Sequence, residues 1–237
     1  MERVSEKMRS LDKVHLLFSG GVDSTALLIL LLEEGVEVES ITFDSDIIPR
    51  RTVERAKIIA DELGVMHRIM HLGVSDKVIE NGKHRCYYCK KSVLENVEAG
   101  RVIIDGTSIT DAREYRPGIR ALEEFGVISP FRECGVGKRE IYEFIKNYKL
   151  PYLYNESCLA TRFIGIPVDL KMGKFIDSVE DALIKEFDLL MVRLRFNGKD
   201  FQLELLPQDS HKAGAVIACL EPMDTGKVCF KVYREFF

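Results

Sequence analysis

A seven-residue segment, Ser-Gly-Gly-Val-Asp-Ser-Thr at 19–25, constrains the fold of this chain more than any other part of the sequence. An apolar run at 14–18, typical of a buried parallel strand, precedes it. An apolar stretch at 24–34, typical of a helix, follows it and is closed by Gly35. Glycines let backbone N–H groups approach an anion closely, and a helix start adds partial positive charge. The segment therefore predicts a phosphate-binding loop.

The side chains of this loop indicate that a metal ion accompanies the phosphates. A carboxylate is unsuited to an anion site, but Asp23 makes sense as a ligand of a bound Mg²⁺. The loop also lacks the lysine of a Walker A motif. We expect the bound nucleotide to contact Ser19, Gly20, Gly21, Val22, Asp23, Ser24 and Thr25.

The pattern of the first two thirds of the chain predicts an α/β fold. Strands are expected at 37–43, 67–72 and 101–105, and helices at 50–63, 92–98, 114–125 and 138–148. Strands that alternate with helices of roughly 12 residues predict a parallel sheet with helices on both faces. Turns rich in Gly, Ser or Thr follow residues 18, 43 and 105. Ligands of such sheets bind beyond the carboxyl ends of the strands, where these turns lie.

The pattern changes after residue 165, which predicts a second, smaller domain. Segments 190–196, 201–206 and 227–233 alternate apolar and polar residues as half-buried strands do, while 179–187 and 210–220 indicate helices. We therefore expect an α/β parallel-sheet domain over residues 1–165 and a small α+β domain, for substrate binding or oligomerisation, over 166–237.

Charge and hydrophobicity limit the partners of the chain. Its 34 Lys and Arg residues against 38 Asp and Glu residues give a net charge of −4, which makes a broadly basic nucleic-acid-binding surface unexpected. The first residues carry charges of both signs and no apolar core of a signal peptide. The longest apolar stretch, 26–32, is far shorter than the ~20 residues that span a membrane. We expect a cytoplasmic protein without membrane partners.

Six cysteines make up the second informative pattern. Cytoplasmic thiols stay reduced, so a cysteine pattern there indicates metal binding or catalysis rather than disulfides. Cys86 and Cys89 form a C-x-x-C pair among basic residues, which favour the thiolate form, and Cys158 lies near Arg162. Three cysteines leave one iron of a cubane cluster open to sulfide or substrate. Two alternatives stay open. The C-x-x-C pair can have a purely structural role, and the basic residues around it can form a solvated surface. We expect Cys134, Cys219 and Cys229 to be packed in the structure.

Several segments together resemble the LarE family of ATP-dependent sacrificial sulfur transferases, a branch of the PP-loop ATP pyrophosphatase superfamily. They are SGGVDST (19–25), RCYYCK (85–90), DGTS (105–108), YRPGIRAL (115–122), ISPF (128–131), CLATRF (158–163) and VRLRF (192–196). The resemblance implies a PP-loop domain that uses ATP and Mg²⁺ to adenylate a carboxylate of pyridinium-3,5-biscarboxylic acid mononucleotide. Sulfur then replaces AMP to give a thiocarboxylate, a step in making the nickel-pincer nucleotide cofactor of lactate racemase.

The family resemblance also implies a source for the sulfur. In some members the cysteine of the CLATR-like segment is consumed, which leaves dehydroalanine, whereas others hold a 4Fe-4S cluster on three cysteines. Cys86, Cys89 and Cys158 match the second pattern, so we expect cluster-dependent transfer, with sacrifice of Cys158 as the alternative.

The resemblance and the chemistry of adenylation assign further site residues. Thr42, Gly106 and Thr107 are expected to line the nucleotide pocket, and Arg116 and Arg162 to neutralise the acyl-adenylate. The two arginines Arg193 and Arg195 share one face of a strand, a spacing that suits a bidentate clamp on the substrate's phosphate. Glu204 and Asp209 are candidate metal ligands. The family's acidic, Asn-rich string after DGT is replaced here by residues 108–111. A homo-oligomer is expected by resemblance alone.

Three other functions remain as alternatives. A PP-loop tRNA thiolase also uses a C-x-x-C pair and a third cysteine, but it needs a strongly positive surface for RNA. An amide-forming PP-loop ligase gives the cysteines no role. A non-catalytic iron–sulfur or ATP sensor would bind ATP without releasing pyrophosphate.

Overall fold

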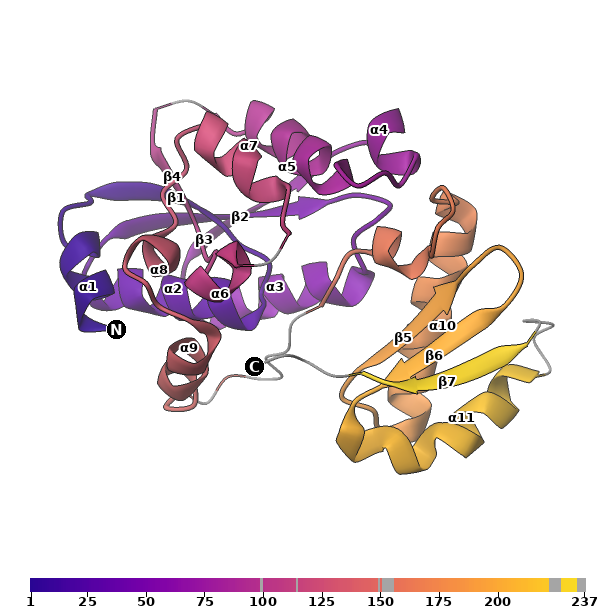
Figure 1. Cartoon of the computed structure of the whole chain (residues 1–237). Helices are drawn as coiled ribbons and strands as arrows, with labels where there is room; N and C mark the ends of the chain where they lie inside the picture. The colour runs from indigo at the N-terminus through magenta and orange to yellow at the C-terminus, as the bar shows by residue number, and fades with distance from the viewer. Residues whose placement is uncertain (99, 114, 149, 151–155, 222–226, 234–237) are drawn as a thin grey trace. The chain divides into compact units, whose positions relative to one another are not determined.

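The structure, a computed structural model, describes residues 1–98, 100–113, 115–148, 150, 156–221 and 227–233. The chain folds into two compact units (Figure 1). The first comprises Met1–Ser75 and Lys83–Glu156, and the second comprises Asp76–Gly82 and Ser157–Phe237. By packing, residues 157–165 therefore group with the second unit, while the domain boundary after residue 165 stays a prediction about function.

A four-stranded parallel sheet forms the centre of the first unit, which confirms the predicted α/β class. The strand order is β3-β2-β1-β4, with β1 at Lys13–Leu17, β2 at Glu37–Asp44, β3 at Met66–His71 and β4 at Val102–Asp105. The chain runs outward from β1 to β3 and then returns to pair β4 with the other side of β1. The order therefore reverses between β1 and β4, and ligands of open parallel sheets bind at such a switch point.

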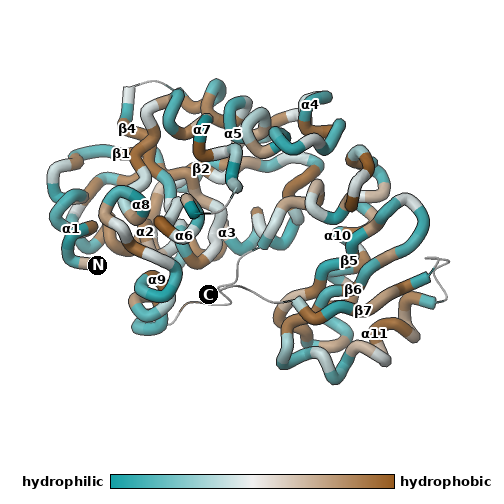
Figure 2. The backbone as a smooth tube through the Cα atoms, viewed as in Figure 1, coloured by the Kyte–Doolittle hydropathy of each residue, from teal (hydrophilic) through white to brown (hydrophobic). Residues whose placement is uncertain are grey.

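Helices cover both faces of this sheet because successive strand residues point to opposite sides. Leu16 and Ile104 pack into the core on one face, while Leu17 and Ile103 pack on the other. The brown apolar segments of Figure 2 follow these strands. The first face is covered by α1 (Glu2–Met8), α2 (Val22–Glu33), α3 (Arg50–Glu62) and α9 (Lys138–Ile145), and the second by α5 (Arg85–Glu95) and α7 (Gly118–Glu124) (Figure 1).

The starts of three predicted helices differ by four or more residues from those observed, and capping explains two of the differences. The helix predicted at 92–98 is α5, which begins at Arg85 and contains both cysteines of the C-x-x-C pair. The helix predicted at 114–125 is α7, which begins after Pro117, a residue suited to helix starts; Glu114 lies outside the described residues. The helix predicted at 179–187 begins at Leu170, because the Asp169 carboxylate accepts hydrogen bonds from two first-turn N–H groups.

The second unit is a three-stranded sheet packed with helices. Strands β5 (Val192–Phe196) and β6 (Phe201–Leu205) pair antiparallel, and β7 (Val228–Val232) pairs parallel to β6. Its helices are α4 (Asp76–Ile79), α10 (Leu170–Phe187) and α11 (Ala213–Leu220), with the 3₁₀ turns η1 (Leu159–Arg162) and η2 (Pro207–Lys212). Among the described helices of the chain, none combines the length and hydrophobicity that a membrane span requires.

Candidate active site

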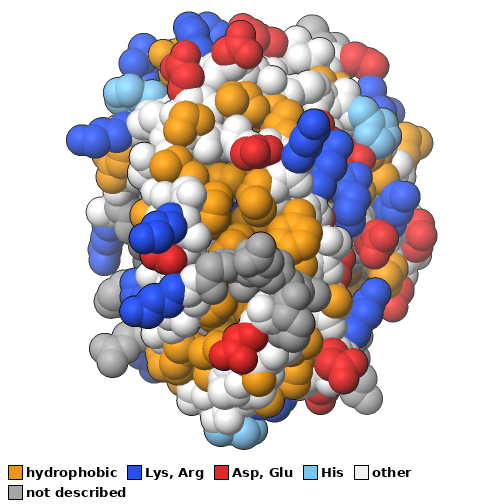
Figure 3. Space-filling view, turned by 90° about the vertical axis from the view of Figure 1, so that its right-hand side faces the viewer, with side chains coloured by type: hydrophobic (Ala, Val, Ile, Leu, Met, Phe, Trp, Pro, Cys, Tyr) orange, Lys and Arg blue, Asp and Glu red, His pale blue; other side chains and the backbone are white. Residues whose placement is uncertain are grey.

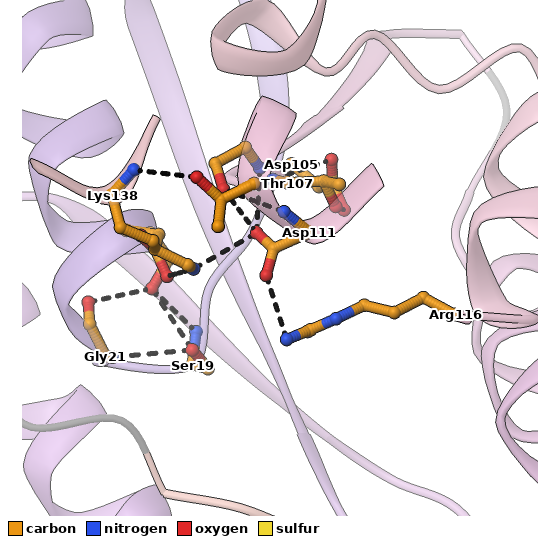
Figure 4. Close-up of polar contacts among 11 residues, drawn as sticks. Ser19, Gly21, Asp105, Thr107, Asp111, Arg116 and Lys138 are labelled. Carbon is orange, nitrogen blue, oxygen red and sulfur yellow. Dashed lines mark hydrogen bonds and ion pairs between the residues drawn. The ribbon is translucent and has the colours of Figure 1, made fainter. Parts of the chain in front are cut away.

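The phosphate-binding loop lies between β1 and α2, at the switch point of the sheet. Gly20 has a φ of +63°, a conformation that disfavours side chains, and a Cβ there would lie 2.9 Å from the backbone of Ala56. The Ser19 and Ser24 hydroxyl oxygens lie 3.2 Å apart, and the Ser19 oxygen accepts a hydrogen bond from the Gly21 N–H (Figure 4). The loop is thus held by its own side chains and by close packing on α3.

Arg55 of α3 also holds this loop, and the sequence pattern did not reveal it. Its Nε donates to the Gly20 carbonyl oxygen at 2.8 Å, and only 8% of the residue is exposed. An arginine in an amphipathic helix 35 positions away carries no local signal of such a contact. Its guanidinium places a positive charge against the loop, which favours an anionic ligand.

A network of charged side chains lies beside the loop (Figure 4). The Lys138 Nζ, from the start of α9, lies 2.6 Å from Asp23 Oδ2 and 3.1 Å from Asp111 Oδ2. Arg116 binds the other oxygen of Asp111 at 2.9 Å. Sequence reasoning proposed Asp23 and Arg116 but missed Lys138 and Asp111. The S-x-x-D spacing of Ser108 and Asp111 was a readable signal, because it forms the capping box that begins α6 (Ile109–Ala112).

The two carboxylates of this network have opposite pKa shifts. Burial raises the pKa of Asp23 above its ordinary value, although the Lys138 ammonium acts in the opposite direction. Burial acts to raise the pKa of Asp111 as well. The charge of Lys138, the hydrogen bonds from Ser108 and the charge of Arg116 outweigh it and hold this pKa below the ordinary value. Asp23 is therefore the carboxylate that would gain most from a further cation.

The residues present fit a Mg²⁺ ion bound together with phosphates. Among the described residues, Asp23 Oδ1 and the Thr25 hydroxyl are buried polar atoms without a hydrogen-bond partner. Mg²⁺ is commonly held by one or two carboxylates, with phosphate and water oxygens completing the coordination. Asp23 and Asp111 would supply the carboxylates, which the shared Lys138 ammonium already brings together.

The turn after β4 touches the phosphate loop. A Cβ on Gly106 would lie 2.9 Å from the Ser24 nitrogen and 3.0 Å from the Asp23 carbonyl carbon. The Asp105 carboxylate fixes this turn by accepting hydrogen bonds from the Thr107 hydroxyl at 2.6 Å and the Ser129 hydroxyl at 2.7 Å (Figure 4). Gly106 and Thr107 thus lie beside the loop, and their contact with a nucleotide stays a prediction.

Thr42 lies buried at the end of β2 and ties three strands together. Its hydroxyl donates to the Phe18 carbonyl oxygen at 2.6 Å, and the His67 Nε2 lies 2.8 Å away. A hydroxyl has a single proton, so His67 donates from Nε2 to the Thr42 oxygen. The proton of the Thr42 hydroxyl is therefore used inside the sheet, and the predicted place of Thr42 beside adenosine stays a prediction.

The environment of His67 predicts a loss of stability in mild acid. Burial, helped by Lys57, lowers the pKa of His67 below 6.5, so the folded state binds this proton less readily than the unfolded state. The free energy of unfolding should therefore fall as the pH drops below 6.5 towards the folded-state pKa. We expect His67→Asn to flatten this part of the profile, measured by urea unfolding across that range. An unchanged slope would contradict the expectation.

The three cysteines predicted to act together are divided between the two units. Cys86 and Cys89 lie three residues apart near the start of α5, a spacing that puts both on one helix face. Cys158 precedes η1 in the second unit, where its carbonyl oxygen accepts a hydrogen bond from the Thr161 hydroxyl. Within the described ranges, no three His, Cys, Asp or Glu side chains are grouped as metal ligands. The arrangement therefore does not show a formed cluster site.

Arg162 has a different position from the one expected for a residue that contacts an acyl-adenylate. Its side chain is 0% exposed and pairs with both Glu180 oxygens at 2.8 Å. Its Nη1 also donates to the Ser157 hydroxyl at 2.7 Å. A guanidinium with no exposed surface positions the Cys158 segment rather than binding a ligand. The expected contact of Arg162 with the acyl-adenylate is therefore not found.

The arginines predicted to clamp the substrate phosphate lie on one face of β5. Arg193 is buried with its guanidinium 4.2 Å from the Tyr233 ring centre. Arg195 pairs with Glu204 at 3.0 Å and donates to the Thr161 carbonyl oxygen. The candidate metal ligand Glu204 is thus neutralised by an arginine. Asp209, the other candidate, accepts from the Leu190 N–H and pairs with Lys212.

Two of the three cysteines expected to be packed are exposed. Cys134 is partly buried and its thiol contacts the Arg3 carbonyl oxygen at 3.4 Å. Cys219 and Cys229 are both exposed, which corrects the expectation. The buried positions of α11 are Ala213, Val216 and Leu220, a helical spacing that turns position 219 outward.

Comparison with known proteins gives matches over most of the chain. Residues 13–100 match the family model described as queuosine biosynthesis protein QueC. An uncharacterised protein of Methanocaldococcus jannaschii is 33% identical over 187 residues, which cover 76% of this chain and 72% of that protein. The pyridinium-3,5-bisthiocarboxylic acid mononucleotide synthase of Lactiplantibacillus plantarum is 28% identical over 144 residues, 56% of this chain and 52% of the synthase. A 7-cyano-7-deazaguanine synthase of Bacillus subtilis is 36% identical over 74 residues, 31% of this chain and 34% of that enzyme.

Proposed function

The chain is a LarE-like member of the PP-loop ATP pyrophosphatases, and we propose that it adenylates a carboxylate of pyridinium-3,5-biscarboxylic acid mononucleotide and converts it to a thiocarboxylate. The observation that carries this proposal is the anion-binding loop at the switch point, with Asp23 and Lys138 beside it. The name of the synthase relative supports the choice of acceptor.

The first half-reaction is attack on ATP by the substrate. A carboxylate oxygen of the substrate bonds to the α-phosphorus, the bond to the bridging oxygen breaks, and pyrophosphate leaves. The loop N–H groups and the Ser19 and Ser24 hydroxyls bind the departing phosphates. Mg²⁺ held by Asp23 and Asp111 would neutralise charge on the phosphate oxygens. No protein nucleophile is needed, because the substrate itself supplies the attacking oxygen.

The second half-reaction replaces AMP by sulfur. A hydrosulfide-level sulfur adds to the activated carbonyl carbon, the bond from that carbon to the AMP oxygen breaks, AMP leaves, and the product is a thiocarboxylate. Cys86, Cys89 and Cys158 are the proposed sulfur-handling residues, as ligands of a 4Fe-4S cluster that would present the sulfur on its open iron. Cys86 and Cys89 belong to the first unit and Cys158 to the second, and we derive no step through the cluster.

Replacing Cys158 separates the two half-reactions. We expect Cys158→Ala to release pyrophosphate when given ATP and the carboxylated mononucleotide, but to form no thiocarboxylate, because activation does not use the thiol. Pyrophosphate is measured by a coupled assay and the product by mass spectrometry. Cys134→Ala is the matched control and should retain both activities, because the Cys134 thiol contacts the backbone carbonyl oxygen of Arg3.

Three results would contradict or redirect the proposal. Thiocarboxylate formation by Cys158→Ala would remove that cysteine from the reaction, and pyrophosphate release only with another acceptor would refute the substrate. A wild-type protein that loses sulfur mass after one turnover would establish the sacrificial route in place of the cluster. Visible absorbance after anaerobic reconstitution, lost in Cys86→Ala and Cys89→Ala, would support the cluster.

An amide-forming PP-loop ligase is the second candidate, because the QueC family match of residues 13–100 supports the ATP-using loop without specifying sulfur transfer. That match includes the phosphate-binding loop and ends before Cys158. A tRNA thiolase receives less support, because the net charge of the chain is −4 and the face drawn in Figure 3 carries side chains of both charges. Incubation with ATP and either ammonia, sulfide or tRNA distinguishes these reactions by their products.

A further inference from the structure

The position of Lys138 carries an inference about how metal and nucleotide enter this site. Its ammonium lies between two carboxylates, 2.6 Å from Asp23 and 3.1 Å from Asp111, and only 15% of its side chain is exposed. The backbone of Lys138 is fixed as well, because its N–H donates to the Thr110 hydroxyl at 3.2 Å. The start of α9 is therefore anchored to α6, with the lysine side chain directed at the phosphate loop (Figure 4).

We propose that Lys138 occupies the place of the divalent cation in the metal-free protein and is displaced when metal and ATP bind together. The proposal rests on the proposed function only in so far as that function assigns Mg²⁺ and ATP to this loop. It makes Lys138 a positioning residue that couples metal binding to nucleotide binding.

Competition follows from the two carboxylates that both cations would share. A Mg²⁺ ion needs direct contact with carboxylate oxygens at about 2.1 Å. The Lys138 ammonium already contacts one oxygen of Asp23 and one of Asp111 at hydrogen-bond distance. Two cations held by the same pair of carboxylates would repel each other strongly in a partly buried site. Metal binding therefore requires the ammonium to move.

The incoming nucleotide gives the displaced ammonium a new partner. Lysine is a compact charge on a flexible four-carbon stem and binds phosphate oxygens well. Without ATP, an ammonium that moved away from Asp23 and Asp111 would lose its anionic partners. With ATP, the metal takes the carboxylates and the lysine takes a phosphate, so each charge keeps a counter-charge. Metal and nucleotide should accordingly bind with positive coupling, and each should raise the affinity for the other by the same factor.

The experiment measures Mn²⁺ binding to the full-length protein by electron paramagnetic resonance, without nucleotide. We expect Lys138→Met to bind Mn²⁺ tighter than the wild type by a factor on the order of ten or more, because the competing cation is gone. Lys146→Met is the matched control, since Lys146 is an exposed lysine that follows the same helix and pairs with Glu143, three residues before it. Its Mn²⁺ affinity should equal that of the wild type.

Two further measurements make the result decisive. Adding Asp23→Asn to Lys138→Met should abolish the gain, which assigns the bound Mn²⁺ to this site. A non-hydrolysable ATP analogue should raise the Mn²⁺ affinity of the wild type by a much larger factor than that of Lys138→Met. If Lys138→Met does not fold by circular dichroism, Lys138→Gln replaces it, because its amide can still donate to the carboxylates.

Equal Mn²⁺ affinities of the wild type and the neutral variant without nucleotide would overturn the proposal. So would an ATP analogue that strengthens Mn²⁺ binding equally in both proteins. The assay contains no pyridinium substrate and no sulfur source. A chain that activates a different acceptor would therefore leave the Mn²⁺ result unchanged, and failure of the proposed function is distinguishable from failure of the cation exchange.

Discussion

Glu180→Ala is expected to destabilise the second unit by about 3–5 kcal/mol, because it removes the counter-charge that the Glu180 carboxylate gives the fully buried Arg162 guanidinium. The Glu180 carboxylate accepts from Arg162 at both oxygens and from the Leu194 N–H at 2.8 Å. It thus joins the Cys158 segment, α10 and β5. Since folded domains are stable by only about 5–15 kcal/mol, this single change should remove a large part of the total.

Urea unfolding followed by far-ultraviolet circular dichroism measures the effect. Glu186→Ala is the matched control, an exposed acidic residue on the same helix whose loss should change the stability by less than about 0.5 kcal/mol. The double variant Arg162→Met with Glu180→Leu should be more stable than Glu180→Ala alone, because no unpaired charge stays buried. A Glu180→Ala protein as stable as the control would refute the importance of this ion pair.

Gly106→Ala is expected to lower the rate of pyrophosphate release by roughly a hundredfold, because small displacements of catalytic groups carry costs of this size. The added Cβ would lie 2.9 Å from the Ser24 nitrogen and 3.0 Å from the Asp23 carbonyl carbon. Both neighbours are backbone atoms in the first turn of α2, so neither can rotate away. The loop and the turn after β4 must separate, which displaces the groups that bind the phosphates.

Gly73→Ala is the control for this substitution. A Cβ on Gly73 meets nothing within 4 Å, and its backbone, like that of Gly106, is outside the left-handed region. The two variants therefore differ in the steric contact and not in backbone strain. Rates of pyrophosphate release are compared at saturating ATP, with circular dichroism to establish that both proteins fold. Equal rates would show that the loop tolerates the displacement.

The fold of the first unit was predictable because its signals are local. The apolar run before Ser19 and the glycines that end α2 and α3 specify alternating strands and helices without knowledge of the rest of the chain. The start of α5 was not predictable, because the segment around Cys86 is rich in charged and aromatic residues. Its apolar residues do not recur at a clear helical spacing. Tertiary packing against α7 stabilises it instead.

The candidate site was predictable only for residues that the loop sequence itself contains. Asp23 was identified from its place in the loop, whereas its partner Lys138 lies 115 positions away and meets it only through the fold. Arg162 shows the reverse error. Its sequence position beside Cys158 indicated a ligand contact, but burial against Glu180, 18 positions further on, could not be read from the pattern.

The second unit includes a short segment, Asp76–Gly82, which lies in the sequence between the two parts of the first unit. Asn81, in a left-handed conformation, donates from its side chain to the carbonyl oxygens of Phe163 and Ile166, and the Val168 N–H donates to the Ile79 carbonyl oxygen. A protease that cut the chain once after Glu156 would therefore not release the second unit as an independent fragment. Residues 157–237 expressed alone would lack these hydrogen bonds. The second unit therefore needs the intact chain to form completely.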